Sequence, residues 1–267
     1  MNRIDETFRR LKKEGKTAFI PYVTAGDPDI DTSKEIVRSL ASSGADIIEL
    51  GIPFSDPLAD GPTIQRAVQR SLKNHCSVGK VFEMVKDLRR EISVPIVFMT
   101  YYNIIFNYGV DRFVKDAKAK GADGVIAADL PMEESEELQK SAEKKDFCVI
   151  MLTAPTTPIP RFRKIAAKSR GFIYYVSLTG VTGERKELSS KLKEDVKKIS
   201  GLSKKPVCVG FGISTPLQAK EIKSVSSGII VGSAIIKIIE KNLDCGKTKM
   251  IQEIGAFARS MARVAHE

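Results

Sequence analysis

This 267-residue sequence has no long apolar run, no closely spaced pair of cysteines and few histidines. No apolar run approaches about 18 residues, and the N-terminus "MNRIDETFRRLKKEG" has a charged, amphipathic helix pattern, so no membrane or targeting segment is expected. Cys76, Cys148, Cys208 and Cys245 are widely spaced, without a C-x-x-C pair. They are expected to be reduced thiols in a cytoplasmic protein. With two histidines in the sequence, no histidine-rich metal site is expected.

The charge balance is basic, with a formal net charge of +10. Such a balance can indicate nucleic acid, a membrane surface or an anionic substrate as partner. Here lysines alternate with acids, as in "EDVKKIS", and no basic patch is interleaved with aromatic residues. The pattern favours solvated helix faces, so neither a nucleic acid nor a membrane is predicted as partner.

Short apolar runs rich in β-branched residues recur eight times along the chain, and each is nearly continuous. This is typical of parallel strands covered on both faces. The runs are "TAFIPYV" (17–23), "DIIELGI" (46–52), "PIVFMT" (95–100), "GVIAADL" (124–130), "FCVIML" (147–152), "FIYYVS" (172–177), "PVCVGF" (206–211) and "GIIVGS" (228–233).

The segments between these runs have helical periodicity, as in "SKEIVRSLASSG" and "SVGKVFEMVKDLRREIS". Eight strands with intervening helices and no Gly/Ser/Pro-rich linker predict an α/β fold, one (β/α)8 TIM-barrel domain over residues 1–267. An N-terminal helix over 3–14 is expected to close the barrel floor. The pattern "TIQRAVQRSLKN" predicts an extra helix after the second strand. The alternative is an open doubly wound sheet, although no G-x-G-x-x-G follows the first strand.

Glu49 stands where the second apolar strand would ordinarily have another aliphatic residue. Burial of an unpaired carboxylate costs free energy, and proteins that bury one usually need it for function. The alternative is a surface hairpin in which Glu49 faces water. Within the barrel, active sites lie at the C-terminal ends of the strands, which places Glu49 and Asp60 of the following loop at the mouth. Two carboxyls in unlike environments can divide acid and base work, with the one in the apolar strand biased towards its protonated form.

Glycine-rich turns follow the sixth, seventh and eighth strands. They would let backbone N–H groups approach an anion, and a helix starting near Ser233 would direct its positive end to the same point. We therefore predict a phosphate site at Gly183, Gly212, Gly232 and Ser233. The alternative is that these glycines only make tight turns. The absence of a P-loop gives no indication of a nucleoside triphosphate.

Other residues near the strand ends complete the predicted site. Thr182, in the loop "TGVTGE", could orient one carboxylate when that loop closes. The pocket for a planar aromatic substrate is expected to be walled by Tyr22, Met99, Ile126, Tyr174 and Phe211. Ordinary barrel core is the competing interpretation for these five.

Six stretches together resemble the tryptophan synthase α subunit family. They are "AFIPYVTAGDP", "IIELGIPFSDPLADGPTIQRA", "MTYYNIIFNYG", "GVIAADLP", "TGVTGE" and "GFGIS…VGSAI", and the match runs in order from about residue 3 to 262. The second stretch is the most specific. The resemblance implies retro-aldol cleavage of indole-3-glycerol phosphate to indole and glyceraldehyde 3-phosphate. It also implies a β-subunit partner that receives the indole, in an α2β2 heterotetramer; the cofactor pyridoxal phosphate belongs to β, and none is expected in this chain.

By the same resemblance, Glu49 is the general acid/base and Asp60 holds the indole N–H. The glycines and Ser233 above match the family's phosphate positions, and Thr182 matches its closing-loop threonine. The resemblance further implies contact with the β subunit through Pro53, Asp56, Pro57, Asn103, Asn107 and Pro131. There are two alternatives. One is another phosphate-binding barrel enzyme, against which the loop with Glu49 and Asp60 argues, and the other is a weakly active or inactive α subunit that serves mainly as an allosteric partner of β.

Overall fold

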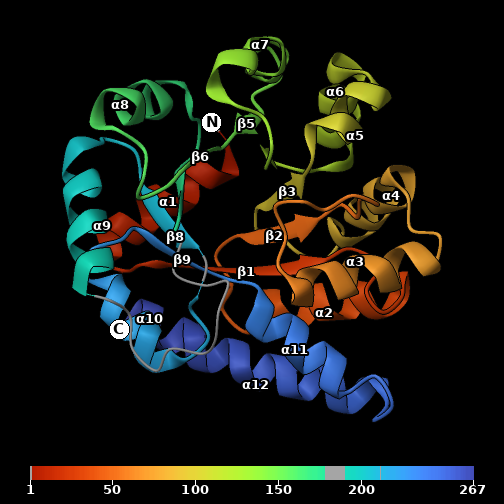
Figure 1. Cartoon of the computed structure of the whole chain (residues 1–267). Coiled ribbons are helices and arrows are strands. Elements are labelled where there is room, and N and C mark those ends of the chain that lie inside the picture. The colour runs from red at the N-terminus through yellow and green to blue at the C-terminus, as the bar shows by residue number, and fades with distance from the viewer. Residues whose placement is uncertain (1, 178–189, 211) are drawn as a thin grey trace.

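The strands form a single parallel sheet that closes on itself (Figure 1). The computed structural model describes residues 2–177, 190–210 and 212–267. Within them the strand order is β5-β4-β3-β2-β1-β9-β8-β7-β6. The bounds are β1 Ala18–Thr24, β2 Ile48–Gly51, β3 Ile96–Thr100, β4 Gly124–Ala127, β5 Cys148–Val149, β6 Met151–Thr153, β7 Ile173–Val176, β8 Val207–Gly210 and β9 Gly228–Val231.

One expected strand, over residues 147–152, is divided in two. β5 pairs with β4, and β6 pairs with β7, with Ile150 between them. β5 and β6 are therefore the first and last strands in the strand order, and the single residue Ile150 connects them along the chain. The described strands make an eight-stranded barrel with a divided fifth strand. The barrel prediction is confirmed, and the open doubly wound sheet is wrong.

Helices surround the strands, and Figure 1 shows them ranged around the barrel. The extra helix after β2 is confirmed as α3, and the N-terminal helix as α1. The seven-residue helix α5 was not predicted. Their bounds are α1 Arg3–Glu14, α2 Ile30–Ser42, α3 Pro62–Lys73, α4 Val78–Leu88, α5 Tyr102–Tyr108, α6 Val110–Lys120, α7 Glu136–Glu143, α8 Ile159–Lys168, α9 Ser190–Leu202, α10 Pro216–Lys223, α11 Ser233–Lys241 and α12 Lys247–His266; a 3₁₀ turn, η1, spans Met132–Glu134.

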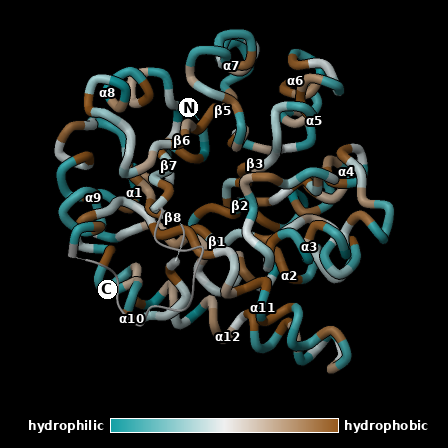
Figure 2. Tube along the Cα trace, in the orientation of Figure 1, coloured by the Kyte–Doolittle hydropathy of each residue, from teal (hydrophilic) through white to brown (hydrophobic). Residues whose placement is uncertain are grey.

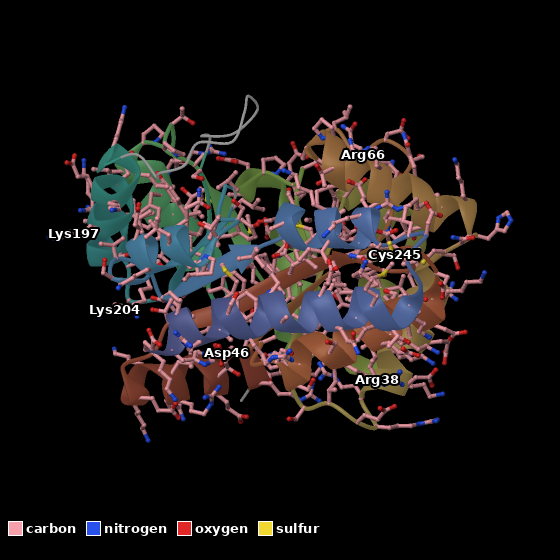
Figure 3. The ribbon with its side chains drawn as sticks, turned by 90° about the horizontal axis from the view of Figure 1, so that it is seen from below. Arg38, Asp46, Arg66, Lys197, Lys204 and Cys245 are labelled. Atoms are coloured by element: carbon pink, nitrogen blue, oxygen red, sulfur yellow. The ribbon has the colours of Figure 1, made fainter. Side chains whose placement is uncertain are left out.

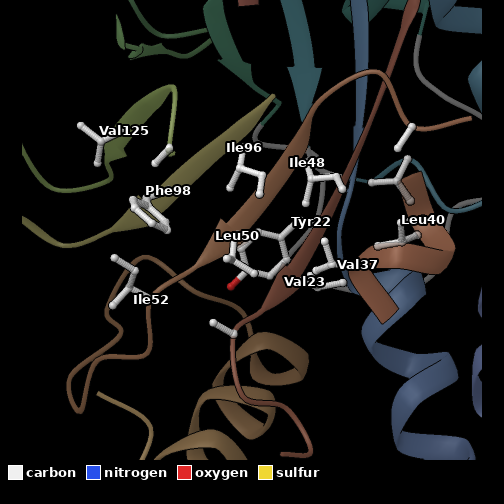
Figure 4. Packing of buried hydrophobic residues seen from close by; sticks show 14 of the residues in the cluster. Tyr22, Val23, Val37, Leu40, Ile48, Leu50, Ile52, Ile96, Phe98 and Val125 are labelled. Carbon is white, nitrogen blue, oxygen red and sulfur yellow. The ribbon is translucent and has the colours of Figure 1, made fainter. Parts of the chain in front are cut away.

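Alternation along each strand divides the apolar residues between two cores, since successive side chains point to opposite faces. In β2, Ile48 and Leu50 pack in the outer core between strands and helices, whereas Ile47, just before β2, belongs to the cluster inside the barrel. Figure 4 shows part of the outer layer, with Ile48, Leu50 and Val37 of α2. Figure 2 shows the brown, hydrophobic positions gathered along the strands.

Helix α1 closes the floor of the barrel. Asn2 caps its start by accepting a hydrogen bond from the Ile4 N–H, and its apolar stripe contributes Ile4, Phe8 and Leu11 to the cluster inside the barrel. Asp46, at the start of the second strand run, accepts hydrogen bonds from the Phe19 N–H at 3.0 Å and from Arg10 at 2.9 Å. Figure 3, seen from below, labels Asp46 beside α12. The opposite end of the barrel is the end where Glu49 lies.

In the part of the chain that the structure describes, no helix combines the length and the apolar character needed to cross a membrane.

Candidate active site at the barrel mouth

Glu49 lies in the middle of β2 and points into the barrel. Its neighbours Ile48 and Leu50 face the helices, so the alternation of the strand turns Glu49 inwards, and the residue is 2% exposed. Its Oε2 has no hydrogen-bond partner. Burial, with a smaller contribution from the nearby charge of Asp60, raises the pKa of Glu49 to about 8. The surface-hairpin interpretation is therefore wrong.

Asp60 comes from the loop between β2 and α3. The loop is held by hydrogen bonds from the Asp60 N–H to the Pro57 carbonyl at 3.0 Å and from the Gln65 side chain to the Asp60 carbonyl at 2.8 Å. Burial raises the pKa of the Asp60 carboxyl to about 6, although a hydrogen bond from the Tyr101 hydroxyl acts in the opposite direction. The two carboxyls therefore prefer different states near pH 7: Glu49 protonated and Asp60 ionised.

Two tyrosine rings stand close to these carboxyls. Tyr22 of β1 pairs in register with Glu49, and its hydroxyl lies 3.2 Å from the Thr24 Oγ1. Tyr174 of β7 is buried, and the charges of Glu49 and Asp60 both help to raise its pKa, with burial as the main cause.

Glycines in the neighbouring strands make room for the rings. A Cβ at Gly51 would overlap the Tyr22 ring, and one at Gly210 would overlap the Tyr174 ring. A Cβ at Gly232 would lie 3.2 Å from Tyr22, so the same glycine serves both the ring and the turn after β9. Sequence reasoning missed Gly51 and Gly210, because only the fold shows which side chain crosses them.

The five residues expected to wall the aromatic pocket have different surroundings. Met99 of β3 pairs in register with Gly51 on one side and with Ile126 of β4 on the other, and it keeps partial exposure. Ile126 is fully buried in the cluster inside the barrel, as the core interpretation expects. Tyr22 and Tyr174 lie beside the carboxyls, and Phe211 lies outside the described residues.

The turns after β8 and β9 lie side by side, since these strands are neighbours. Gly212 is exposed with φ +83°, a backbone conformation that favours glycine. Gly232 is the N-cap of α11 and supplies no side-chain cap, and the exposed Ser233 is the first helical residue. By contrast, the N-terminus of α10 is capped by its own side chains, in a capping box of Thr215 and Gln218. Of these two helix starts, that of α11 is therefore the one suited to an anion.

Like Phe211, the predicted residues Thr182 and Gly183 lie outside the described residues. Among those that the structure describes, no cluster of three or more His, Cys, Asp or Glu side chains is placed to hold a metal ion.

Beside the loop that holds Asp60 lies a surface cavity of about 520 Å³. Its lining comprises Phe54, Asp56, Leu58, Ala59, Tyr101 and Asp129. Asp129 belongs to the loop after β4, which ends at Ala127, and its carboxylate accepts a hydrogen bond from the Tyr102 N–H at 2.6 Å. Sequence reasoning missed Tyr101, although this residue directly follows β3 and the rule that site residues lie at strand ends would have indicated it.

The six residues expected to contact a partner lie on this side of the mouth. Asp56, Asn103, Asn107 and Pro131 are exposed, Pro57 is half-buried and Pro53 is buried. Asn103 and Asn107 share one face of α5, where the Asn107 amide donates to the Asn103 side-chain oxygen at 2.8 Å.

Sequence reasoning missed the two most exposed large apolar side chains of the described residues. Leu58, in the same loop, is 93% exposed, and Phe106, on α5, is 64% exposed. An apolar residue inside the polar stretch "SDPLADG" was the available signal for Leu58.

The fold and the mouth define a class: (β/α)8 barrels with two unlike carboxyls at the mouth, an arrangement suited to acid–base chemistry. The family model for the tryptophan synthase alpha chain matches residues 8–266. The alpha chain of Caldanaerobacter subterraneus subsp. tengcongensis is 47% identical over 264 residues, which cover 99% of this chain and all of that one. The alpha chain of Desulfatibacillum aliphaticivorans is 50% identical over 264 residues, 98% of this chain and all of that one.

Solved structures agree with the sequence relatives. The crystal structure of tryptophan synthase subunit alpha from Legionella pneumophila matches with a TM-score of 0.92 at 39% identity, covering 99% of this chain and 98% of that one. A structure of Mycobacterium tuberculosis tryptophan synthase matches with a TM-score of 0.89 at 33% identity, covering all of this chain and 99% of that one.

The chain belongs to the tryptophan synthase alpha chain family. It is accordingly a carbon–carbon lyase that cleaves indole-3-glycerol phosphate to indole and glyceraldehyde 3-phosphate. It works with a beta subunit; the alpha chain needs no cofactor of its own, and pyridoxal phosphate belongs to beta. The alternative of an alpha chain that acts mainly as an allosteric partner is not favoured.

Proposed function

We propose that Glu49 and Asp60 perform this cleavage by moving one proton between two substrate positions. Protonated Glu49 donates its proton to C3 of the indole ring, which creates a positive charge shared with the ring nitrogen. The Asp60 carboxylate accepts the hydrogen bond of that N–H and stabilises the charge. The C3-protonated ring is then the electron sink that carbon–carbon cleavage requires.

The second step returns the proton. The Glu49 carboxylate takes the proton of the hydroxyl on the carbon joined to C3, and the C=O bond of glyceraldehyde 3-phosphate forms. The bond between that carbon and C3 breaks, and its electron pair restores the aromatic indole. Glu49 ends protonated as it began, so the cycle needs no outside acid or base.

The phosphate is proposed to bind at the turns after β8 and β9. Gly212, Gly232 and Ser233 offer backbone N–H groups and the positive end of α11, which suits a dianion. Gly183 and Thr182 stay predictions for the same phosphate and for loop closure. Anchoring the phosphate on one side of the mouth holds the indolylglycerol portion across Glu49.

The β subunit is proposed to dock on the cavity side of the mouth and to receive the indole there, within an α2β2 tetramer. The predicted contact residues surround Leu58 and Phe106, whose exposed side chains suit the apolar centre of an interface. Docking there would place the partner directly over the Asp60 loop. We infer further that residues 1–267 act as one barrel domain, and that the free, mostly buried cysteines fit a cytoplasmic protein.

One observation supports these roles above the others: the unpartnered Oε2 of Glu49, buried at the mouth beside Asp60. An unpaired polar atom in such a place costs free energy unless a ligand engages it.

The test is release of glyceraldehyde 3-phosphate from indole-3-glycerol phosphate, with and without β, by the wild type, Glu49→Gln and Asp60→Asn. Losses of at least about 100-fold are expected for Glu49→Gln. Glu143→Gln, an exposed change on α7, is the control and should keep full turnover. Wild-type turnover by Glu49→Gln would refute the assignment.

A further inference from the structure

Tyr101 joins the end of β3 to the catalytic loop. It follows Thr100, the last residue of β3, and is the N-cap residue of α5. The residue is 6% exposed, and its ring packs against Phe54 with centroids 5.2 Å apart. One side chain from a neighbouring strand end therefore braces the start of the loop that holds Asp60.

The Tyr101 hydroxyl bridges two consecutive residues further along the same loop. It accepts a hydrogen bond from the Ala59 N–H at 2.9 Å and donates one to the Asp60 Oδ2 at 3.1 Å. A phenol hydroxyl has a single proton to donate. Because the Ala59 amide is already the donor in the first hydrogen bond, the hydroxyl proton is directed to the Asp60 carboxylate. The bridge fixes the loop backbone and the carboxylate with respect to each other.

This arrangement has two consequences for Asp60. A hydrogen-bond donor to the carboxylate favours its ionised form and so opposes the effect of burial. The ionised form is the one that can stabilise a positive charge on the substrate. A carboxylate whose orientation is already fixed also loses little freedom when it accepts a substrate N–H.

We propose that Tyr101 is a positioning residue that holds the Asp60 carboxylate in the ionised state and in the orientation needed by the substrate N–H. The inference rests on the role proposed above for Asp60. It assigns no contact between Tyr101 and the reacting atoms.

The test is a double-mutant cycle on the cleavage reaction with Tyr101→Phe, Asp60→Asn and the double variant. Tyr101→Phe keeps the ring against Phe54 and removes the bridge. It is expected to lower kcat/KM by about tenfold to a hundredfold, the usual range for a hydrogen bond to a charged group. In the Asp60→Asn background the same change should cost less than about twofold, because the two residues act as a unit.

The pH profile of Tyr101→Phe is a second readout, independent of how active Asp60→Asn remains. Without the donor, the pKa of Asp60 rises, so the acid limb of kcat/KM should move to higher pH while the alkaline limb stays. Tyr102→Phe is the matched control, since the Tyr102 ring faces Phe106 on α5 with centroids 6.2 Å apart. It should leave both limbs in place, and thermal melting should confirm that all variants are folded.

Different outcomes distinguish a failure of the role of Tyr101 from a failure of the role of Asp60. An unmoved acid limb, or equal losses in both Asp60 backgrounds, would overturn the positioning role while leaving the role of Asp60 intact. Full activity of Asp60→Asn with Tyr101 untouched would instead overturn the role of Asp60 and the inference together.

Discussion

The two carboxyls predict a bell-shaped dependence of kcat/KM on pH. In the proposed cycle the free enzyme is productive when Asp60 is ionised and Glu49 is protonated, and their pKa values are about 6 and about 8. Two such groups leave about four-fifths of the molecules productive at pH 7, and about one tenth at pH 5 or pH 9. We therefore expect kcat/KM to be greatest near pH 7 and to fall by nearly tenfold at either extreme.

The assay is initial-rate release of glyceraldehyde 3-phosphate at low substrate concentration across this range, with the isolated chain. Because the two groups interact, the limbs report macroscopic values of the pair. Glu49→Gln stays neutral at all pH values, so its residual activity should lose the alkaline limb and keep the acid limb. A profile that rises steadily to pH 9 would mean that Glu49 starts the reaction ionised, and the proposed order of proton transfers would be refuted.

Three further predictions concern binding, stability and packing. Leu58→Ser should weaken β binding by about 2 kcal/mol, roughly thirtyfold in Kd by calorimetry, because an anchor of the proposed interface is lost. Arg70→Ala should lower the free energy of unfolding in urea by about 3 kcal/mol, since it leaves the fully buried Asp27, now paired at 2.7 and 2.9 Å, without its partner. Gly210→Ala should destabilise the fold by about 1–3 kcal/mol and lower kcat/KM, because the new methyl group displaces the Tyr174 ring.

Each of these changes has a matched control within the chain. Leu217→Ser alters a 60%-exposed leucine on α10 and should not affect β binding. Arg112→Ala removes an arginine whose side chain is 74% exposed, and should change stability by less than about 0.5 kcal/mol. Gly201→Ala adds a methyl group where no atom lies within 4 Å, and should not destabilise the fold. Equal effects in variant and control would contradict the corresponding prediction.

The fold could be predicted from the sequence because each barrel strand is a separate apolar run. The division of the fifth strand could not, because β5 and β6 are equally apolar and the break at Ile150 is set by pairing with different neighbours. The helix α5 was missed because seven residues rich in aromatic and β-branched side chains give little helical signal.

The candidate site could be predicted in part. Glu49 was found because a carboxylate interrupts an apolar strand, and Asp60 because it follows that strand. The hydrogen bond from Tyr101 to Asp60 and the close approach of the Tyr174 ring to Gly210 join residues from different parts of the barrel, and no local pattern marks such pairs. The exposure of Phe106 was likewise hidden, since an apolar residue at helical spacing is more often buried.

The proposed cycle depends above all on Glu49 being protonated at neutral pH in the free enzyme. A carbon-13 NMR titration of glutamate side-chain carboxyls measures this directly, with the Glu49 signal assigned by its loss in Glu49→Gln. We expect a midpoint near pH 8, moved from the ordinary value of 4.5 by burial and by Asp60. A midpoint close to 4.5 would show an ionised Glu49, and the proposed acid–base cycle would be wrong.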